Sequence, residues 1–142
     1  MCEYCGCRRI PEIARLGEEH ETITELADEA DVGRADRAIR NAALRRLRQA
    51  LVPHAQREEQ GIFTEARQAG LTGYYIEDLE EDHRRFKEAL DDPESLDDAT
   101  LETLLKDLDR HIAIEEYDVF PAASKHLSDE QWRSIERMDS AP

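Results

Sequence analysis

Histidine and glutamate recur in this chain at a spacing that suits metal binding. Residues 54–63 read His-Ala-Gln-Arg-Glu-Glu-Gln-Gly-Ile-Phe, and residues 111–120 read His-Ile-Ala-Ile-Glu-Glu-Tyr-Asp-Val-Phe. Both segments fit the pattern H-x-x-x-E-E-x-x-[IV]-F. Residues four apart on a helix point the same way, so an imidazole and a carboxylate at this spacing can converge on one cation.

A second pair of matching segments lies upstream of the first. Residues 16–25 and 79–88 share the pattern L-x-E-[ED]-H-x-x-[IF]-x-E. The sequence therefore predicts one helical hairpin used twice, each copy bringing two histidines and a glutamate. A doubled half-site predicts a site for two metals, and its candidate ligands are His20, His54, Glu58, His83, His111 and Glu115.

The spacing alone is weak evidence, because a chain this rich in glutamate produces it by accident. His126 and Glu130 also have it, although a helix break is expected between them at Ser128. The stronger indication is that all six candidates occupy positions where a helix stripe calls for an apolar residue. Two buried carboxylates without partners would cost several kcal/mol each. We therefore favour a metal site over a polar core that binds nothing.

The elements that must position these residues can be predicted from hydrophobic periodicity. Apolar side chains at steps of three or four indicate helices over 13–30, 44–62, 76–90 and 101–119, with breaks near 31–34, 70–73 and 91–98. A short fifth helix follows Ser128, which forms a capping box with Gln131. The predicted fold is all-α: an antiparallel up-and-down four-helix bundle with a short C-terminal fifth helix.

Two features complicate this bundle. Pro53 and Pro121 fall where helix would otherwise continue, and each should kink or end its helix. His20 also lies about ten residues before the first break and His54 about twenty after it, a mismatch of roughly 15 Å along the bundle. Either the first connection is long and irregular, through Asp36, or the first helix runs further than its stripe.

Composition narrows the classes of partner. The 142 residues carry 19 basic and 34 acidic side chains, and the net charge of −15 argues against binding nucleic acid or an anionic membrane. No stretch approaches the ~20 apolar residues of a membrane span. The first residues contain no apolar run typical of a signal peptide, so a cytoplasmic location is predicted. The sequence does not fix an oligomeric state.

Three cysteines mark the N-terminus as a separate segment. Cys2, Cys5 and Cys7 form C-x-x-C-x-C in a tail over 1–9, ahead of a bundle domain over 10–142. They could form a redox site that passes electrons to the two metals, or a second metal site with His126 as fourth ligand. The simplest interpretation is a terminal tail without chemistry.

The ordered set H … HxxxE … H … HxxxE, with its EExxIF and EExxVFP segments, resembles the hemerythrin-like (HHE cation-binding) domains from about His20 to Phe120. The resemblance implies a four-helix bundle around a non-haem di-iron centre. Glu58, Glu115 and an oxo or hydroxo group would bridge the two irons. By the same resemblance, His20 and His54 would bind one iron, and His83 and His111 the other.

The chain departs from the oxygen-carrying members of that family at two points. The carriers have a further histidine one turn from the third-helix ligand, where this chain has Leu79 and Lys87. Their last carboxylate lies five residues after its histidine, which would be Glu116; we favour Glu115, because it continues the apolar stripe. Without the additional histidine, the site has one more open or water-filled position. This favours reaction with peroxide, nitric oxide or O₂, or iron sensing, over simple reversible O₂ carriage.

The predicted function is therefore a di-iron protein that binds or reacts with O₂, peroxide or nitric oxide, with an electron donor if it is catalytic. Whether it is an enzyme is left open. The alternatives are an iron store or an iron or redox sensor without catalysis, and a purely structural bundle. Glu59 and Glu116 are expected to face solvent or to accept imidazole N–H groups from outside the site. Phe63, Phe86 and Phe120 are expected to pack in the core.

Overall fold

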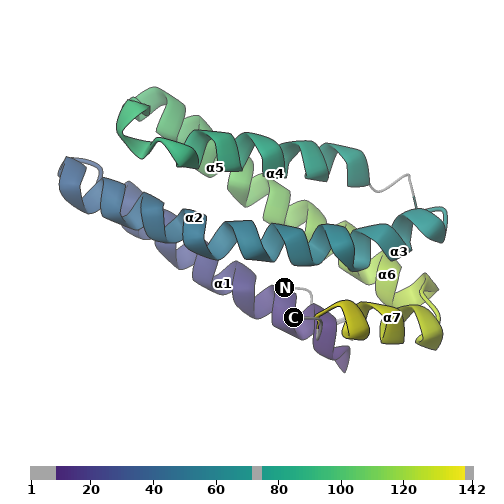
Figure 1. The fold of residues 1–142 in the computed structure, drawn as a ribbon. Helices are drawn as coiled ribbons and strands as arrows, with labels where there is room; N and C mark the ends of the chain where they lie inside the picture. The colour runs from purple at the N-terminus through teal and green to yellow at the C-terminus, as the bar shows by residue number, and fades with distance from the viewer. Residues whose placement is uncertain (1–8, 72–74, 140–142) are drawn as a thin grey trace.

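A computed structural model describes residues 9–71 and 75–139 of the chain, and every regular element within them is helical (Figure 1). The elements are α1 (Pro11–Val32), α2 (Arg37–Gln60), α3 (Ile62–Gln68), α4 (Ile76–Asp91), the 3₁₀ turn η3 (Pro93–Ser95), α5 (Asp98–Ile114), the π-helical segment η4 (Glu115–Val119), α6 (Phe120–His126) and α7 (Asp129–Asp139).

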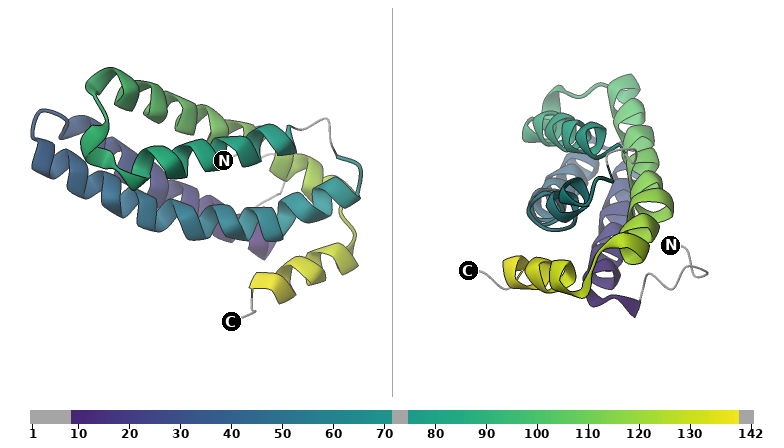
Figure 2. Two further views of the ribbon diagram at one scale, coloured as in Figure 1. Left: turned by 45° about the horizontal axis from the view of Figure 1, so that its top comes forward. Right: turned by 90° about the vertical axis from the view of Figure 1, so that its right-hand side faces the viewer.

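The long helices form an up-and-down bundle. Because α3 continues the course of α2, and α6 that of α5, the bundle has four rods: α1, α2–α3, α4 and α5–α6. Figure 2 shows α7 outside this arrangement, against the end of the bundle where α1 begins. The predicted fold class is confirmed, and so is the short fifth helix. Its capping box is present, with Ser128 N–H donating to Gln131 Oε1 at 2.9 Å and Gln131 N–H to Ser128 Oγ at 3.2 Å.

The mismatch between His20 and His54 is about halved, because the first helix runs further than its apolar stripe and the second begins only at Arg37. The first helix reaches Val32, and Asp36 caps the next helix by accepting from Ala38 N–H at 3.0 Å. The remaining difference is five residues, or about 8 Å. Side chains lean toward the N-terminus of their own helix, so on antiparallel helices these two lean toward each other. Their ring centroids lie 4.7 Å apart.

Neither proline ends a rod of the bundle. α2 passes through Pro53 and continues to Gln60, so of the two alternatives, a kink or a helix end, the helix end is wrong for this proline. Pro121 lies in the first turn of α6, where a missing N–H is tolerated. The departure from regular α-helix comes earlier in this rod, at η4.

The core consists of two apolar clusters, one toward each end of the bundle. One contains Leu16, Phe63, Leu79 and Phe120, together with Ile135 of α7. The other lies toward the α1–α2 turn and contains Ile23, Leu47, Phe86 and Leu108. On every rod the candidate ligands fall between these two sets of residues. The bundle therefore carries one buried polar layer between two apolar ones.

Arg40 is a fully buried cation that joins α2 to the loop before α5. Its guanidinium donates to the carbonyls of Pro93 and Leu96, both at 2.8 Å, and to Asn41 Oδ1 at 2.9 Å. The Arg40→Met change keeps most of the volume but leaves these buried acceptors unpaired. We expect it to lower the free energy of unfolding by about 3 kcal/mol, measured by urea denaturation.

The exposed Arg46 on the same helix is the matched control. It pairs with Glu29 at 2.9 Å in solvent, so Arg46→Met should change the free energy of unfolding by less than ~1 kcal/mol. Equal losses in the two variants would contradict the structural role given to Arg40.

No described helix is both long enough and apolar enough to cross a membrane. The predicted cytoplasmic location and the division of the chain at residue 10 stay predictions.

Candidate metal centre

All six candidate ligands meet in the polar layer. α1 supplies His20, α2 supplies His54 and Glu58, α4 supplies His83, α5 supplies His111, and Glu115 is the first residue of η4. All six are buried, and Glu58 and Glu115 are both 0% exposed. Each of the four rods therefore contributes at least one side chain to a single site that solvent does not reach.

The six residues form two overlapping groups. His20 and His54 combine with Glu58 and Glu115 in one group, which we name the first half-site. His83 and His111 combine with the same two glutamates in the other, the second half-site. Within each group, one ligand atom from every residue lies within 4.8 Å of all the others. Two cations could therefore share both carboxylates.

The two glutamates reach both half-sites. Glu58 lies 3.3 Å from His54 Nε2 and 3.1 Å from His83 Nε2 through Oε1, and 3.6 Å from His20 Nε2 through Oε2. Glu115 lies 2.9 Å from His20 Nε2 through Oε1, and 3.3 Å from His111 Nε2 through Oε2. This is the placement that bridging carboxylates require.

Most of the atoms that could bind a metal in this layer have no hydrogen-bond partner, although they lie close together. Both oxygens of Glu58 and of Glu115 are buried without a hydrogen bond, as are the Nε2 atoms of His20, His83 and His111. The oppositely charged groups attract, but their orientation does not form hydrogen bonds. Buried polar atoms are normally paired, and imidazole nitrogen with carboxylate oxygen is a donor set typical of iron, manganese and zinc. The residues present therefore fit a pair of metal ions.

Four further carboxylates, here named the outer carboxylates, approach the Nδ1 atoms of the histidines. Glu19 lies 2.8 Å from His54 Nδ1 and Asp82 lies 3.1 Å from His111 Nδ1. Glu116 lies 3.0 Å from His20 Nδ1, and Glu59 lies 3.6 Å from His83 Nδ1. A carboxylate that accepts a hydrogen bond from Nδ1–H leaves Nε2 free to bind a metal and fixes the ring orientation.

The outer carboxylates follow the internal repeat. Each is the chain neighbour of a candidate ligand, and each contacts a histidine on another helix: Glu19 precedes His20 and Asp82 precedes His83, whereas Glu59 follows Glu58 and Glu116 follows Glu115. Sequence reasoning anticipated Glu59 and Glu116 but missed Glu19 and Asp82. The acidic residue before the histidine in both upstream segments was the available signal.

The segment η4 gives the two glutamates at its start inward positions. In a regular helix Glu116 would point about 100° away from Glu115. Here the backbone N–H of Phe120 donates to the carbonyl of Glu115, five residues back, and the wider turn leaves Glu116 only 9% exposed. The solvent-facing alternative for Glu116 is therefore wrong. The structure places Glu115 in both metal-binding groups and Glu116 outside them.

Aromatic rings cover the histidines. Phe120 stacks on His20 and Phe63 stacks on His83, each with ring centroids 5.7 Å apart. Phe86 meets His111 edge-on, with ring centroids 5.4 Å apart. All three phenylalanines are buried, as predicted. They belong to the two apolar clusters, so the same packing that forms the core keeps water from the polar layer.

Without a metal, protons hold the layer together. Burial alone lowers the pKa of His83, but Glu58, Glu59 and Glu115 outweigh burial and raise that pKa to about 10. Burial likewise opposes the charge on His111, yet Glu115 and Asp82 raise its pKa to about 9. Burial raises the pKa of Glu58, and the neighbouring histidines overcome this and hold it well below its ordinary value.

These shifts predict that metal binding releases protons. The pKa of His83 is about 10 and that of His111 about 9, so both side chains are protonated at pH 7. Each must lose a proton before its Nε2 can bind a cation. Calorimetric titration of metal-free protein with Co²⁺, in two buffers of different ionisation enthalpy, should show release of at least these two protons per chain. A binding heat independent of the buffer would contradict this.

One predicted candidate lies apart from the site. His126 is exposed in the last turn of α6 and belongs to neither half-site. Cys2, Cys5 and Cys7 lie outside the described residues, so the redox and second-metal interpretations of the tail stay predictions.

Comparison with known protein families identifies a cation-binding domain. The family model described as "Hemerythrin HHE cation binding domain" matches residues 12–123, a span that contains all six candidate ligands and all four outer carboxylates. No curated protein and no solved structure matched the chain.

Proposed function

Since the chain belongs to the hemerythrin HHE cation-binding domain family, we propose that its buried layer holds two iron ions, where a small oxidant or gas binds or reacts. The ligands considered are O₂, peroxide and nitric oxide. The observation that carries the proposal is the set of buried donor atoms without hydrogen bonds, contributed by all four rods and able to form two half-sites.

The donor count supports a site that is open to small molecules. Each half-site offers two imidazole nitrogens and one oxygen from each of Glu58 and Glu115, so four protein atoms face each metal. A closed structural zinc site is satisfied by four ligands, whereas iron commonly takes about six. With iron in place, the centre would supply electron transfer and open coordination positions for a diatomic or peroxide ligand.

The protein's own residues would prepare this site in three ways. Three of the outer carboxylates, Glu19, Asp82 and Glu116, hold their imidazoles with Nε2 facing inward. Glu58 and Glu115 bring two negative charges that offset part of the charge of two cations. The stacked rings of Phe63 and Phe120 keep bulk water out, which strengthens the electrostatic interactions inside.

The third rod adds no further ligand beyond His83. Leu79, one turn before it, is buried in an apolar cluster, and Lys87, one turn after it, pairs with Asp91 at the surface at 3.3 Å. An iron in the second half-site would therefore keep open coordination positions, which favours reactivity over simple carriage.

Metal analysis combined with visible spectroscopy tests the proposal. Aerobically purified protein should contain two irons per chain and absorb in the near ultraviolet, as an oxo-bridged di-ferric centre does and zinc does not. Peroxide, or nitric oxide and O₂ added to the reduced protein, should change the spectrum. An iron-loaded protein whose spectrum responds to none of these would refute the reactive function, and fewer than one metal per chain would favour a purely structural bundle.

An iron store or an iron or redox sensor is the second candidate. The observation that favours it is that the polar layer joins all four rods, so metal binding and folding are linked. This function predicts a large effect of iron on stability without a spectral response to oxidants. Equal melting temperatures with and without chelator would exclude it.

A further inference from the structure

His83 is the least constrained of the four histidines. The Nδ1 atoms of His20, His54 and His111 each lie within 3.1 Å of an outer carboxylate. The Nδ1 atom of His83 is buried without a hydrogen bond, and its nearest carboxylate oxygen, on Glu59, lies 3.6 Å away. The second half-site therefore contains one imidazole whose Nδ1 atom no carboxylate holds within hydrogen-bond distance.

The backbone explains this difference between the two copies of the repeat. Glu59 and Glu116 occupy the same position in the pattern H-x-x-x-E-E-x-x-[IV]-F. Glu116 lies in the wide turn of η4, which draws it inward until its side chain is 11% exposed. Glu59 lies in regular α-helix, which directs it toward the surface, and its side chain is 32% exposed. Identical sequence positions thus hold their histidines unequally.

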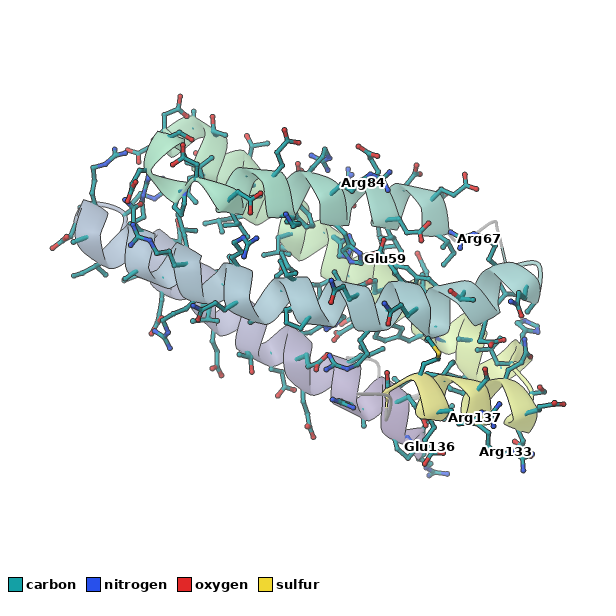
Figure 3. The ribbon with its side chains drawn as sticks, viewed as in Figure 1. Glu59, Arg67, Arg84, Arg133, Glu136 and Arg137 are labelled. Atoms are coloured by element: carbon teal, nitrogen blue, oxygen red, sulfur yellow. The ribbon has the colours of Figure 1, made fainter. Side chains whose placement is uncertain are left out.

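Charge pairing adds to the difference. Glu19 is held by Arg57 at 2.7 Å, and Asp82 by Arg85 at 2.5 Å. Among the described residues, the only cationic group within ion-pair distance of Glu59 is His83 itself. Figure 3 labels Glu59 and Arg84 on the same face of the molecule, but Arg84 is bound to Glu81. Glu59 is therefore free to move, and only a short movement separates it from His83.

We infer that the first half-site binds its metal before the second, and that Glu59 acts as a positioning residue that closes onto His83 to complete the second. The inference rests on the proposed two-metal site. His20 and His54 already present their Nε2 atoms in a fixed orientation. At the second half-site, His83 and Glu59 must first lose side-chain freedom, which weakens binding there.

Locating the first metal tests the order of filling. A crystal of metal-free protein supplied with one equivalent of Co²⁺ should show the anomalous signal of cobalt between His20 and His54. Repulsion between two cations would produce two binding steps even in identical half-sites. The test is therefore the position of the first cobalt ion and not the number of binding steps. A signal shared equally, or found between His83 and His111, would overturn the inference.

A pair of variants tests the role of Glu59. Glu59→Ala should weaken the second Co²⁺ step roughly ten- to hundredfold and leave the first unchanged, whereas Glu116→Ala, its counterpart in the repeat, should weaken the first. Glu59→Gln keeps a carbonyl acceptor and should recover part of the loss. An unchanged second step in Glu59→Ala would overturn the inference alone. If the wild-type protein binds no Co²⁺, both the inference and the proposed metal site are overturned.

Discussion

Replacing Glu58 or Glu115 by glutamine is expected to reduce the metal content of the purified protein from two ions per chain to one or none. Each carboxylate lies beside histidines of both half-sites, so each change weakens both at once. Glutamine keeps the shape of the side chain but offers one neutral acceptor oxygen and an amide that donates. The number of metal ions lost per folded chain is measured by elemental mass spectrometry of the purified protein.

The control for these variants is His126→Ala, which removes an imidazole outside both half-sites. It should retain two metals per chain and the wild-type melting temperature. Circular dichroism separates loss of metal from loss of fold, because the buried glutamines should leave the helical signal intact even where they lower stability. Normal metal content in both glutamine variants would show that neither glutamate bridges the metals.

Sequence periodicity was sufficient to predict the bundle and the inner layer of the site. A helix face repeats every three to four residues, so an imidazole or carboxylate that falls on an apolar stripe can be predicted to be buried. That is why Glu58 and Glu115 could be identified, although glutamate is abundant in this chain. A different signal, the capping box of Ser128 and Gln131, located the start of α7, because these two residues cap the helix through local contacts alone.

The outer carboxylates could not be predicted in the same way. Glu19 and Asp82 contact histidines on other helices, and their partners depend on how the rods are rotated against each other. Their own positions lie beside the stripe, where an acidic residue normally faces solvent. Arg57, which holds Glu19, is likewise an ordinary helix-surface residue when read from the sequence.

The unequal backbone of the two repeats has one cause that only the structure reveals, at Gly61, and one that the sequence signalled, at Pro121. Gly61 lies under α7, and a Cβ there would approach Ile135 Cγ2 to 3.1 Å and the Arg57 carbonyl to 2.9 Å. The first repeat therefore ends its helix at a glycine. In the second repeat, Pro121 has no N–H for the carbonyl four residues back, and the wide turn of η4 precedes it. The pattern of ligands is shared, whereas the neighbours that shape it are not.

Removing the metals is expected to lower the melting temperature by roughly 12–16 °C. Chelation leaves both glutamates buried beside histidines without hydrogen bonds. At a free metal concentration a thousand times Kd, binding to the native state alone adds ~4 kcal/mol of stability. For a chain of this size that corresponds to roughly 3–4 °C per kcal/mol. Differential scanning calorimetry with and without chelator measures the shift, with Arg46→Met as a variant that should show the same shift as wild type.

The difference between metal-free and metal-loaded protein should widen as the pH rises. His83 has a pKa of about 10 in the folded metal-free chain, and histidine in an unfolded chain titrates near about 6.5. A raised pKa stabilises the fold fully below the unfolded value, and this stabilisation is lost as the pH rises through the folded value. His111, with a pKa of about 9, acts in the same direction. Bound metal replaces these protons, so the loaded protein should keep its melting temperature between pH 7 and 9.5 while the metal-free protein loses stability. Parallel curves would show that the protons and the metals do not compete for the same layer.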